Sequence, residues 1–198
     1  MRPRVILNCA ASADGKISLP NRKQLNISNI EDFERVHELR SECDAIIVGI
    51  GTILEDNPSL TVRNNSRAKP IRVILDTHCR IPSNSNVLNG DSKTIVAIGE
   101  NPDDIKLENA EVLRCGNKKI NLTQLLDILG ERGVKKILVE GGETVMRSFL
   151  KEQLFDEYNV FFSSIIIGGV ETPTIAGGKG FQNEKSVLNL KLSSVKQI

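Results

Sequence analysis

The sequence predicts an α/β domain whose sheet is mixed but mostly parallel and is flanked by helices. Three observations predict this class. Short apolar runs rich in Val and Ile recur along the chain, segments with helical periodicity lie between them, and the chain ends in a stretch where apolar and polar residues alternate. The near-continuous apolarity of the runs is typical of central strands covered on both faces.

The apolar runs have the length and composition of buried strands. We expect strands at residues 4–10, 45–49, 71–75, 94–98, 136–140 and 158–163. Near the end of the chain, residues 186–195 alternate between apolar and polar side chains. This alternation predicts a final antiparallel or edge strand, and it is the reason that we expect a mixed sheet.

Helical periodicity separates several of these strands. We expect helices at residues 30–43, 122–132 and 143–153. In the first of them, Phe33, Val36 and Leu39 recur at the spacing of one helical face. The second carries a stripe of leucines and ends near a glycine, which suits a helix terminus. Strands that alternate with helices in this way favour a parallel arrangement.

Length and charge indicate one soluble domain. The 198 residues are enough for one well-cored domain and few for two, so we expect a single domain over residues 1–198. Lys plus Arg total 26 against 25 for Asp plus Glu, whereas a protein that grips nucleic acid shows a basic excess. No apolar run approaches the roughly 20 residues that span a membrane. We therefore expect a cytoplasmic protein with no nucleic-acid or membrane partner.

The four cysteines predict neither a metal site nor a disulfide framework. Cys9, Cys43, Cys79 and Cys115 lie far apart in the sequence, so there is no CxxC pair and no zinc-ligand spacing. A chain that builds its own core has little need of disulfides. We expect reduced thiols and no metal.

The strongest chemical signal is the segment KKILVEGGET at residues 135–144, where a buried strand runs into Gly141 and Gly142 and then a helix. Glycines allow a ligand to approach the backbone closely, and the first amides of a helix attract an anion, typically phosphate. The same two glycines also suit an ordinary tight turn. The segment is not the GxGxxG fingerprint, so by itself it leaves both alternatives open.

A second strand, at residues 45–48, also ends in glycines that are followed by polar side chains. In open α/β sheets, ligands bind at the carboxyl ends of the strands. Thr52 and Asp56 can bind ribose or amide groups there, and Arg63 can bind a phosphate bidentately. The acid also precedes an Asn-Pro pair, which suits a simple turn.

Two further strand ends carry polar clusters. Residues 12–16 include Asp14 and Lys16, although the Asp-Gly pair within them equally suits a hairpin-like turn. The strand at 71–75 is followed by the sequence DTHCR, in which His78 and Arg80 are potential cations for a ribose 2′-phosphate. The alternative for this segment is a solvated loop.

Two side chains of the first helix have competing interpretations. Arg40 lies late in the helix, near the strand that begins at residue 45, and a surface salt bridge and a ligand role are about equally favoured. For His37 we expect a satisfied or surface histidine rather than a catalytic one.

Taken together, these segments resemble the reductase family of riboflavin biosynthesis, which includes freestanding archaeal and fungal reductases and the carboxyl-terminal domain of the bacterial bifunctional deaminase-reductase. The run SADGKI at residues 12–17 is similar to the amino-terminal motif of the family. Arg40 and the segment DAIIVGIGTILEDNPSLTVR at 44–63 are similar to its longest signature. Residues 75–80 and 139–142 match two later motifs in order and spacing, so the resemblance covers essentially the whole chain.

The resemblance implies a dihydrofolate-reductase-like α/β fold, a homodimer and NADPH as cofactor. The implied reaction converts the ribosylamino side chain of 2,5-diamino-6-ribosylamino-4(3H)-pyrimidinone 5′-phosphate to ribitylamino, an early step of riboflavin biosynthesis. The deaminase zinc signature, H-x-E with P-C-x-x-C, does not occur in the sequence. This fits the freestanding type, which in archaea and fungi acts before deamination.

The resemblance also implies site residues by position. The NADPH contacts of the family fall on Thr52, Asp56, Thr77, His78, Cys79, Arg80, Gly141, Gly142, Glu143 and Thr144. Its substrate contacts fall on Asn8, Arg40, Leu60, Arg63 and Glu140, with the two arginines as candidates for the substrate phosphate. Asp14 and Lys16 match positions beside the substrate and are the catalytic candidates.

The implied chemistry suits this inventory. A ring-opened ribosylamine is an imine, and a hydride delivered to C1′ gives an amine. The protein must align the nicotinamide with that carbon and let the nitrogen and O4′ gain protons. Asp14, Lys16 and Glu140 are the available acid-base groups, and no metal is required. Our hypothesis is that Lys16 assists ring opening or stabilises the charge at the imine.

Two alternatives compete with this interpretation. One is another NADPH reductase of the same fold that acts on a pterin, in which Arg40 and Arg63 would be idle. The other is a non-catalytic NADPH-binding module, which would bind the cofactor and turn over nothing. Activity with the phosphorylated ribosylamine separates the predicted enzyme from both.

Overall fold

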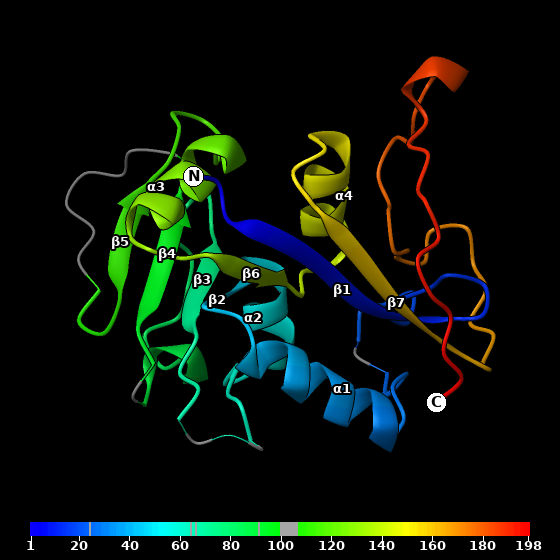
Figure 1. The fold of residues 1–198 in the computed structure, drawn as a ribbon, viewed down its shortest axis with the longest axis horizontal. Helices are drawn as coiled ribbons and strands as arrows, with labels where there is room; N and C mark the ends of the chain where they lie inside the picture. Colours follow the sequence, from blue (N-terminus) through cyan, green and yellow to red (C-terminus); the bar gives the residue numbers. More distant parts are fainter. Residues whose placement is uncertain (24, 64, 66, 91, 100–106) are drawn as a thin grey trace.

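A seven-stranded sheet organises the chain. The computed structural model describes residues 1–23, 25–63, 65, 67–90, 92–99 and 107–198, and within them the strand order is β5-β4-β3-β2-β6-β1-β7 (Figure 1). All the neighbouring strands in this order are paired in parallel. The strands are β1 (Arg4–Ser12), β2 (Ala45–Gly49), β3 (Ile71–Leu75), β4 (Thr94–Ile98), β5 (Glu111–Arg114), β6 (Lys136–Val139) and β7 (Glu157–Ser163).

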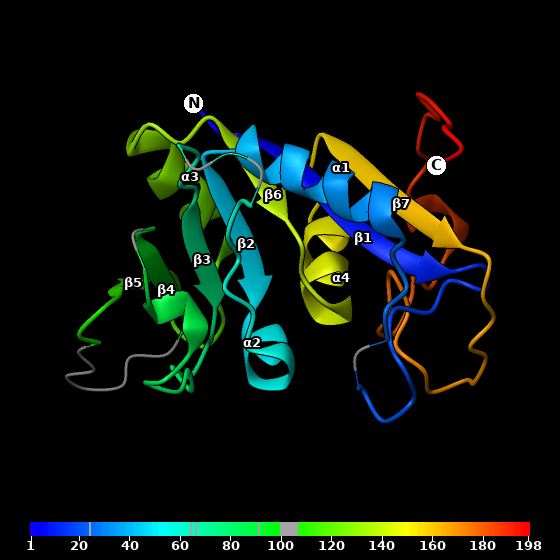
Figure 2. The same cartoon turned by 90° about the horizontal axis from the view of Figure 1, so that it is seen from below.

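Helices cover both faces of this sheet (Figures 1 and 2). The α-helices are α1 (Ile30–Ser41), α2 (Ile50–Asp56), α3 (Leu122–Glu131) and α4 (Glu143–Lys151), and the short 3-10 helices are η1 (Asn86–Leu88) and η2 (Glu184–Ser186). The side chain of Asn29 caps α1 by accepting a hydrogen bond from the Asp32 amide at 2.8 Å. This bond satisfies one of the free donors at the start of the helix.

Alternation along the strands divides the core into two clusters. Val5 and Leu7 of β1 face the cluster that contains the apolar stripes of α3 and α4. Ile6 faces the opposite cluster, which contains the buried residues of α2 and, at its margin, Leu39 of α1. Because the central strands are buried on both faces, they read as continuous apolar runs in the sequence.

The predicted α/β class and the mostly parallel sheet are confirmed. The strands expected at residues 45–49, 71–75 and 94–98 have those bounds in the structure, and the others agree to within two residues. The helices begin where expected and end one or two residues earlier. The edge strand β5, the helix α2, which directly follows β2, and the short helices η1 and η2 were not predicted.

The strand predicted at residues 186–195 is wrong. The chain has no regular structure after η2, and Leu190, Leu192 and Val195 are 59%, 76% and 84% exposed. Only Leu188 of this stretch is packed against the core. The alternating residues do give this segment an apolar side, but the segment pairs with no described strand of this chain. The antiparallel element expected of a mixed sheet is therefore not formed here.

None of the described helices is long and apolar enough to cross a membrane.

Candidate active site

The strand order brings the predicted motifs to one edge of the sheet. β3, β2, β6 and β1 are consecutive neighbours, and parallel strands end on the same side. The register pairs Val139 of β6 with Ile47 of β2 and with Leu7 of β1. Beyond the end of β6, the Glu140 amide still donates to the Ile47 carbonyl at 3.0 Å. The segments that follow these four strands therefore lie at one edge of the sheet.

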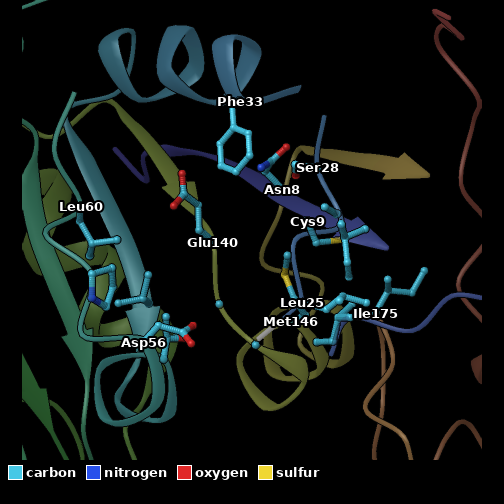
Figure 3. A pocket seen from close by; sticks show the side chains of 18 of the residues that line it. Asn8, Cys9, Leu25, Ser28, Phe33, Asp56, Leu60, Glu140, Met146 and Ile175 are labelled. Carbon is cyan, nitrogen blue, oxygen red and sulfur yellow. The ribbon is translucent and has the colours of Figure 1, made fainter. Parts of the chain in front are cut away.

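Two overlapping cavities open at this edge. The larger has a volume of about 570 Å³ and the smaller about 390 Å³. Figure 3 shows the larger one, with Phe33 of α1 directed toward Glu140 and Asn8 from one side and Met146 of α4 on the other. The wall common to both cavities is formed by β1, α1, the segment after α2 and Glu140. Its residues are Asn8, Cys9, Ala10, Ser28, Phe33, Arg40, Pro58, Leu60 and Glu140.

The predicted site residues that line these cavities are separated according to their predicted roles. Thr52, Asp56, Gly141 and Gly142, all predicted cofactor contacts, line only the larger cavity. The predicted substrate contacts Asn8, Arg40, Leu60 and Glu140 line both. Arg63 lines only the smaller one. The two sets of residues therefore meet at a shared wall.

Arg40 and Glu140 are bound to each other. Arg40 donates from Nε to Glu140 Oε1 at 2.8 Å and from Nη2 to Oε2 at 2.6 Å, and its Nη1 donates to the Thr61 carbonyl at 3.2 Å. Burial alone would lower the pKa of Arg40, but the charge of Glu140 and these hydrogen bonds outweigh burial and raise it. The structure thus answers one open question: Arg40 forms a salt bridge, and that salt bridge lies inside the site.

Arg63 differs from Arg40 in having an uncompensated charge. Among the described residues, no hydrogen bond or ion pair engages its guanidinium. Its backbone amide donates to His37 Nδ1 at 3.4 Å. The smaller cavity therefore has a cation available for an anionic group, whereas the charge of Arg40 is largely neutralised by Glu140.

Asn8 places a buried polar group in the common wall. The residue is 6% exposed, and its Oδ1 has no hydrogen-bond partner among the described residues. A buried acceptor without a donor costs free energy unless a ligand or water satisfies it. The orphaned oxygen is therefore consistent with a ligand contact at this position.

Close packing explains the glycines before α4. A Cβ atom at Gly141 would overlap the side chain of Val145, and one at Gly49 would lie 2.8 Å from Val145 Cγ2. The N-cap of α4 is Gly142, which makes no side-chain capping bond. The start of α4 thus lies tightly against the end of β2, with its first amides uncapped by a side chain.

The other residues predicted at this helix start point elsewhere. The Glu143 carboxylate contacts Gly177 and lies 4.0 Å from Arg22 Nη2. Thr144 is exposed and lines neither cavity.

The loop after β3 lies at the same edge but outside both cavities. Thr77, His78, Cys79 and Arg80 line neither. Buried Asp76 organises this loop: its Oδ2 accepts from the Ile81 amide at 2.8 Å, and its Oδ1 lies 3.6 Å from Arg80 Nε. Cys79 has a φ of 53°, in the left-handed region. Because Leu75 pairs with Gly49, the loop begins beside the start of α2.

Asp14 and Lys16 form part of a well-ordered turn. Asp14 accepts hydrogen bonds from Ser12 Oγ at 2.6 Å and from the amides of Ile167 and Gly168 at 3.1 and 2.7 Å. The hydrogen bond from Ser12, with the amide bonds, lowers the pKa of Asp14 to about 2. Lys16 Nζ lies 3.5 Å from the Thr172 carbonyl. Neither residue lines either of these two cavities, although Ile17, which follows Lys16, lines the larger one. Their catalytic role stays a prediction.

A group of three or more His, Cys, Asp or Glu side chains that could hold a metal ion is not found among the described residues.

Comparison with known proteins adds a family to this geometry. The family model described as the RibD C-terminal domain matches residues 3–198. This chain belongs to the RibD C-terminal domain family. It is 40% identical to the 2,5-diamino-6-ribosylamino-4(3H)-pyrimidinone 5′-phosphate reductase of Archaeoglobus fulgidus over 195 residues, which cover 91% of this chain and 89% of that protein. The protein of the same name from Methanothermobacter thermautotrophicus is 38% identical, with coverage of 97% and 92%.

Solved structures of the RibD family share the fold. Acinetobacter baumannii RibD, form 2, has a TM-score of 0.85 and 26% identity, over 99% of this chain and 55% of that chain. The present chain therefore spans about half of that longer protein. The riboflavin biosynthesis reductase of Saccharomyces cerevisiae has a TM-score of 0.73 and 26% identity, over 88% and 78% of the two chains. These likenesses agree with the predicted dihydrofolate-reductase-like fold.

In this RibD-family chain, several residues that line the cavities were not predicted. Cys9, His37, Met146 and Ile175 belong to this group, and so does Phe33, which was predicted only to share a helical face with Val36 and Leu39. Phe33 is 49% exposed. On the helical face that Phe33 shares with Leu39, only Leu39 packs against the core. An apolar residue of a helix that meets no core partner marks a cavity wall only once the neighbouring elements are known.

Proposed function

We propose that this chain uses NADPH to reduce the ribosylamino side chain of 2,5-diamino-6-ribosylamino-4(3H)-pyrimidinone 5′-phosphate to ribitylamino, in riboflavin biosynthesis. One observation carries the proposal. Four of the residues predicted for the cofactor, Thr52, Asp56, Gly141 and Gly142, line the larger cavity, and Arg63 lines the adjoining one. The other residues predicted to bind the substrate, Asn8, Arg40, Leu60 and Glu140, line the wall common to both. A hydride donor and its acceptor must be held side by side in this way. The archaeal relatives carry the name of this reaction.

The start of α4 suits a dinucleotide phosphate. Its uncapped amides favour an anion, and open space adjoins Gly142, because nothing lies within 4 Å of a Cβ placed there. Gly141 and Gly142, with Thr52 and Asp56, would hold the cofactor. The loop of Thr77, His78, Cys79 and Arg80 would hold its outer part, with Arg80 as the candidate for the 2′-phosphate of NADPH. When bound, the cofactor supplies a hydride.

The remaining predicted cofactor contacts would act from the rim. Thr144 lies in the first turn of α4, and the Glu143 carboxylate faces Gly177. We propose that Glu143 holds the 177–180 segment beside α4 instead of touching the cofactor directly.

The substrate would occupy the common wall and the smaller cavity. Asn8 Oδ1 needs a donor, which the amino groups of a diaminopyrimidine supply. Leu60 offers an apolar contact, and Arg63 offers a charge for the phosphate. Since Arg40 is engaged by Glu140, we propose that Arg40 fixes the position of the Glu140 carboxylate and acts on the substrate through it.

Proton handling would involve the turn that follows β1. Reduction of the imine adds a hydride at C1′ and a proton at nitrogen, and ring opening adds a proton at O4′. Lys16 is our candidate for assisting these steps. Asp14 would contribute by holding the turn that carries Lys16, because its carboxylate is engaged by Ser12 and two loop amides.

We further propose that residues 1–198 work as one reductase domain in a cytoplasmic homodimer. All four cysteines are unpaired, which suits a reducing compartment. The exposed apolar side chains of the tail, among them Leu190 and Leu192, support a dimer because a second copy is a natural cover for them.

The test is NADPH oxidation by the purified chain. With the phosphorylated diaminopyrimidine ribosylamine we expect oxidation of NADPH and a product that has gained two hydrogen atoms, identified by mass spectrometry. A pterin reductase would instead oxidise NADPH with dihydrofolate. A non-catalytic module would bind NADPH and oxidise it with neither substrate. Either of those two results would refute the proposed reaction.

A further inference from the structure

The smaller cavity contains an imidazole that no predicted role explains. His37 of α1 lines this cavity, as do Arg40, one turn further along the helix, and Arg63. The His37 ring lies against the segment after α2, where its Nδ1 accepts a hydrogen bond from the Arg63 amide at 3.4 Å. The imidazole is therefore tied to the backbone of the residue whose guanidinium carries the uncompensated charge.

This contact determines which ring nitrogen carries the proton. A nitrogen that accepts a hydrogen bond has no proton of its own, so the proton of a neutral His37 is on Nε2. Burial lowers the pKa of His37, the charges of Arg40 and Arg63 lower it further, and Glu140 partly opposes them. At neutral pH the ring is thus a neutral imidazole with one N–H donor, at Nε2.

The charges around the ring favour an anion in this cavity. Arg40 is compensated by Glu140, and the other acid that lines the cavity, Asp32, is bound by Arg35 at 2.6 Å. Asp32 also accepts a hydrogen bond from Ser28 Oγ. The charge left over is that of Arg63. A cation beside a neutral N–H donor suits the several acceptor oxygens of a phosphate monoester.

We propose that His37 binds the 5′-phosphate of the substrate through Nε2–H, next to Arg63, and so helps this cavity to select phosphorylated over unphosphorylated substrates. This inference rests on the proposed function and deepens it. The Arg63 amide fixes the tautomer, so the donor is preorganised before the substrate arrives. His37 acts in binding and takes no part in the chemical step.

The test compares His37→Ala and His37→Gln with the unaltered enzyme, using the phosphorylated substrate and its dephosphorylated form. A hydrogen bond to a charged acceptor is worth about tenfold in affinity or more. For His37→Ala we expect KM for the phosphorylated substrate to rise about tenfold, with kcat within about twofold. Glutamine places an N–H near the position of Nε2, so His37→Gln should recover most of the loss. KM for NADPH and for the dephosphorylated substrate should not change.

Glu38→Ala is the matched control, because Glu38 is the next residue of α1, is exposed and lines neither cavity. Thermal unfolding of each variant shows whether it is folded. A rise in KM that is equal for the phosphorylated and dephosphorylated substrates would overturn the proposal, as would a loss confined to kcat. A glutamine variant no better than the alanine variant would count equally against it.

A binding measurement separates this proposal from the proposed function. Ribose 5-phosphate and ribose serve as probes in titration calorimetry with the intact chain. We expect ribose 5-phosphate to bind, His37→Ala to weaken it about tenfold, and ribose to bind neither protein. If the chain reduces no pyrimidine but this pattern holds, the reaction is wrong and the phosphate site stands. If the substrate is reduced but His37→Ala binds ribose 5-phosphate normally, the His37 proposal fails alone.

Discussion

Arg40 on α1 and Glu140 beyond β6 are joined by two parallel hydrogen bonds, of 2.8 and 2.6 Å, across 100 residues of sequence. Lysine keeps the charge of arginine but cannot form this fork. We expect Arg40→Lys to cost about 1–2 kcal/mol of stability, a fall in Tm of about 3–6 °C, and to lower kcat/KM about tenfold. Calorimetry and steady-state kinetics measure both effects.

The matched control for this pair is Arg4→Lys. Arg4 bonds Glu157 at 2.8 Å, but its side chain is 60% exposed, and exposed ion pairs contribute little. Its Tm and activity should stay near those of the unaltered protein. Equal effects at Arg4 and Arg40 would show that the buried fork has no special role.

Gly141 should not tolerate a methyl group. A Cβ there overlaps Val145, so Gly141→Ala forces the end of β6 and the start of α4 apart. Overpacking of this kind costs about 1–3 kcal/mol, and the displaced helix start should also weaken NADPH binding. Unfolding midpoints and NADPH titration measure these changes.

Two variants make this prediction specific. At Gly142, nothing lies within 4 Å of an added Cβ, so Gly142→Ala should leave stability nearly unchanged. Val145→Ala removes two of the three clashing atoms, Cγ1 and Cγ2, but keeps Cβ, so it should restore only part of the stability when combined with Gly141→Ala. If the loss of stability in the double variant equals the sum of the losses in the two single variants, the steric explanation is contradicted.

Lys16→Ala tests the predicted role of this lysine. If Lys16 assists ring opening or the charge at the imine, single-turnover reduction should slow by roughly 100-fold or more, while NADPH binding changes little. Rapid-mixing kinetics at saturating NADPH measure the chemical step. Unchanged single-turnover rates would refute the catalytic role and assign Lys16 a structural one, through its contact with the Thr172 carbonyl.

The tail should mediate self-association. Leu190 and Leu192 are 59% and 76% exposed, and replacing both with serine removes the apolar surface that a second copy would cover. We expect light scattering to report a dimer for the unaltered chain and a shift toward monomer for the double variant. Lys191→Ser, between the two leucines, is the control and should remain dimeric. A monomer at all accessible concentrations in the unaltered chain would disprove this part of the proposal.

The thiols should be unreactive in the folded protein. Burial raises the pKa of Cys9, Cys43 and Cys115 to about 11 in each case, and burial with the charge of Asp76 raises that of Cys79. Since the thiolate is the reactive form, iodoacetamide should modify the native chain slowly at mildly alkaline pH and faster only as the pH approaches about 11. The chain unfolded in guanidinium provides the control and should react rapidly at all four positions. Fast modification of the native protein at neutral pH would refute this.

The strands that could be predicted from the sequence are those whose burial leaves a continuous apolar run. Ile71–Leu75 and Thr94–Ile98 are buried on both faces, so their apolar runs coincide with the strands. β5 (Glu111–Arg114) has a short E-V-L-R sequence at the sheet edge, which offers no such run. α2 has only seven residues, contains Gly51 and begins directly at the end of β2. Its sequence therefore shows no clear helical periodicity.

The site was predictable only in part, for a different reason. Strand ends in a parallel sheet converge, so Thr52, Asp56 and Glu140 could be assigned to one edge before the structure was known. His37 and Cys9 could not, because they lie within a helix and a strand and reach the cavity only through the packing of α1 and β1 around it. The fork between Arg40 and Glu140 likewise depends on where α1 crosses the sheet.

The hydrogen bond from the Glu140 amide to the Ile47 carbonyl has a practical implication for engineering. It anchors Glu140 to the middle of the sheet, whereas other parts of the cavity lining come from connecting segments such as 25–28 and 59–63. Libraries that diversify those segments can reshape substrate preference while the backbone of the central carboxylate stays in register. Diversifying the strand ends instead would shift the backbone that positions Glu140. Most such variants would lose catalytic activity as well as selectivity.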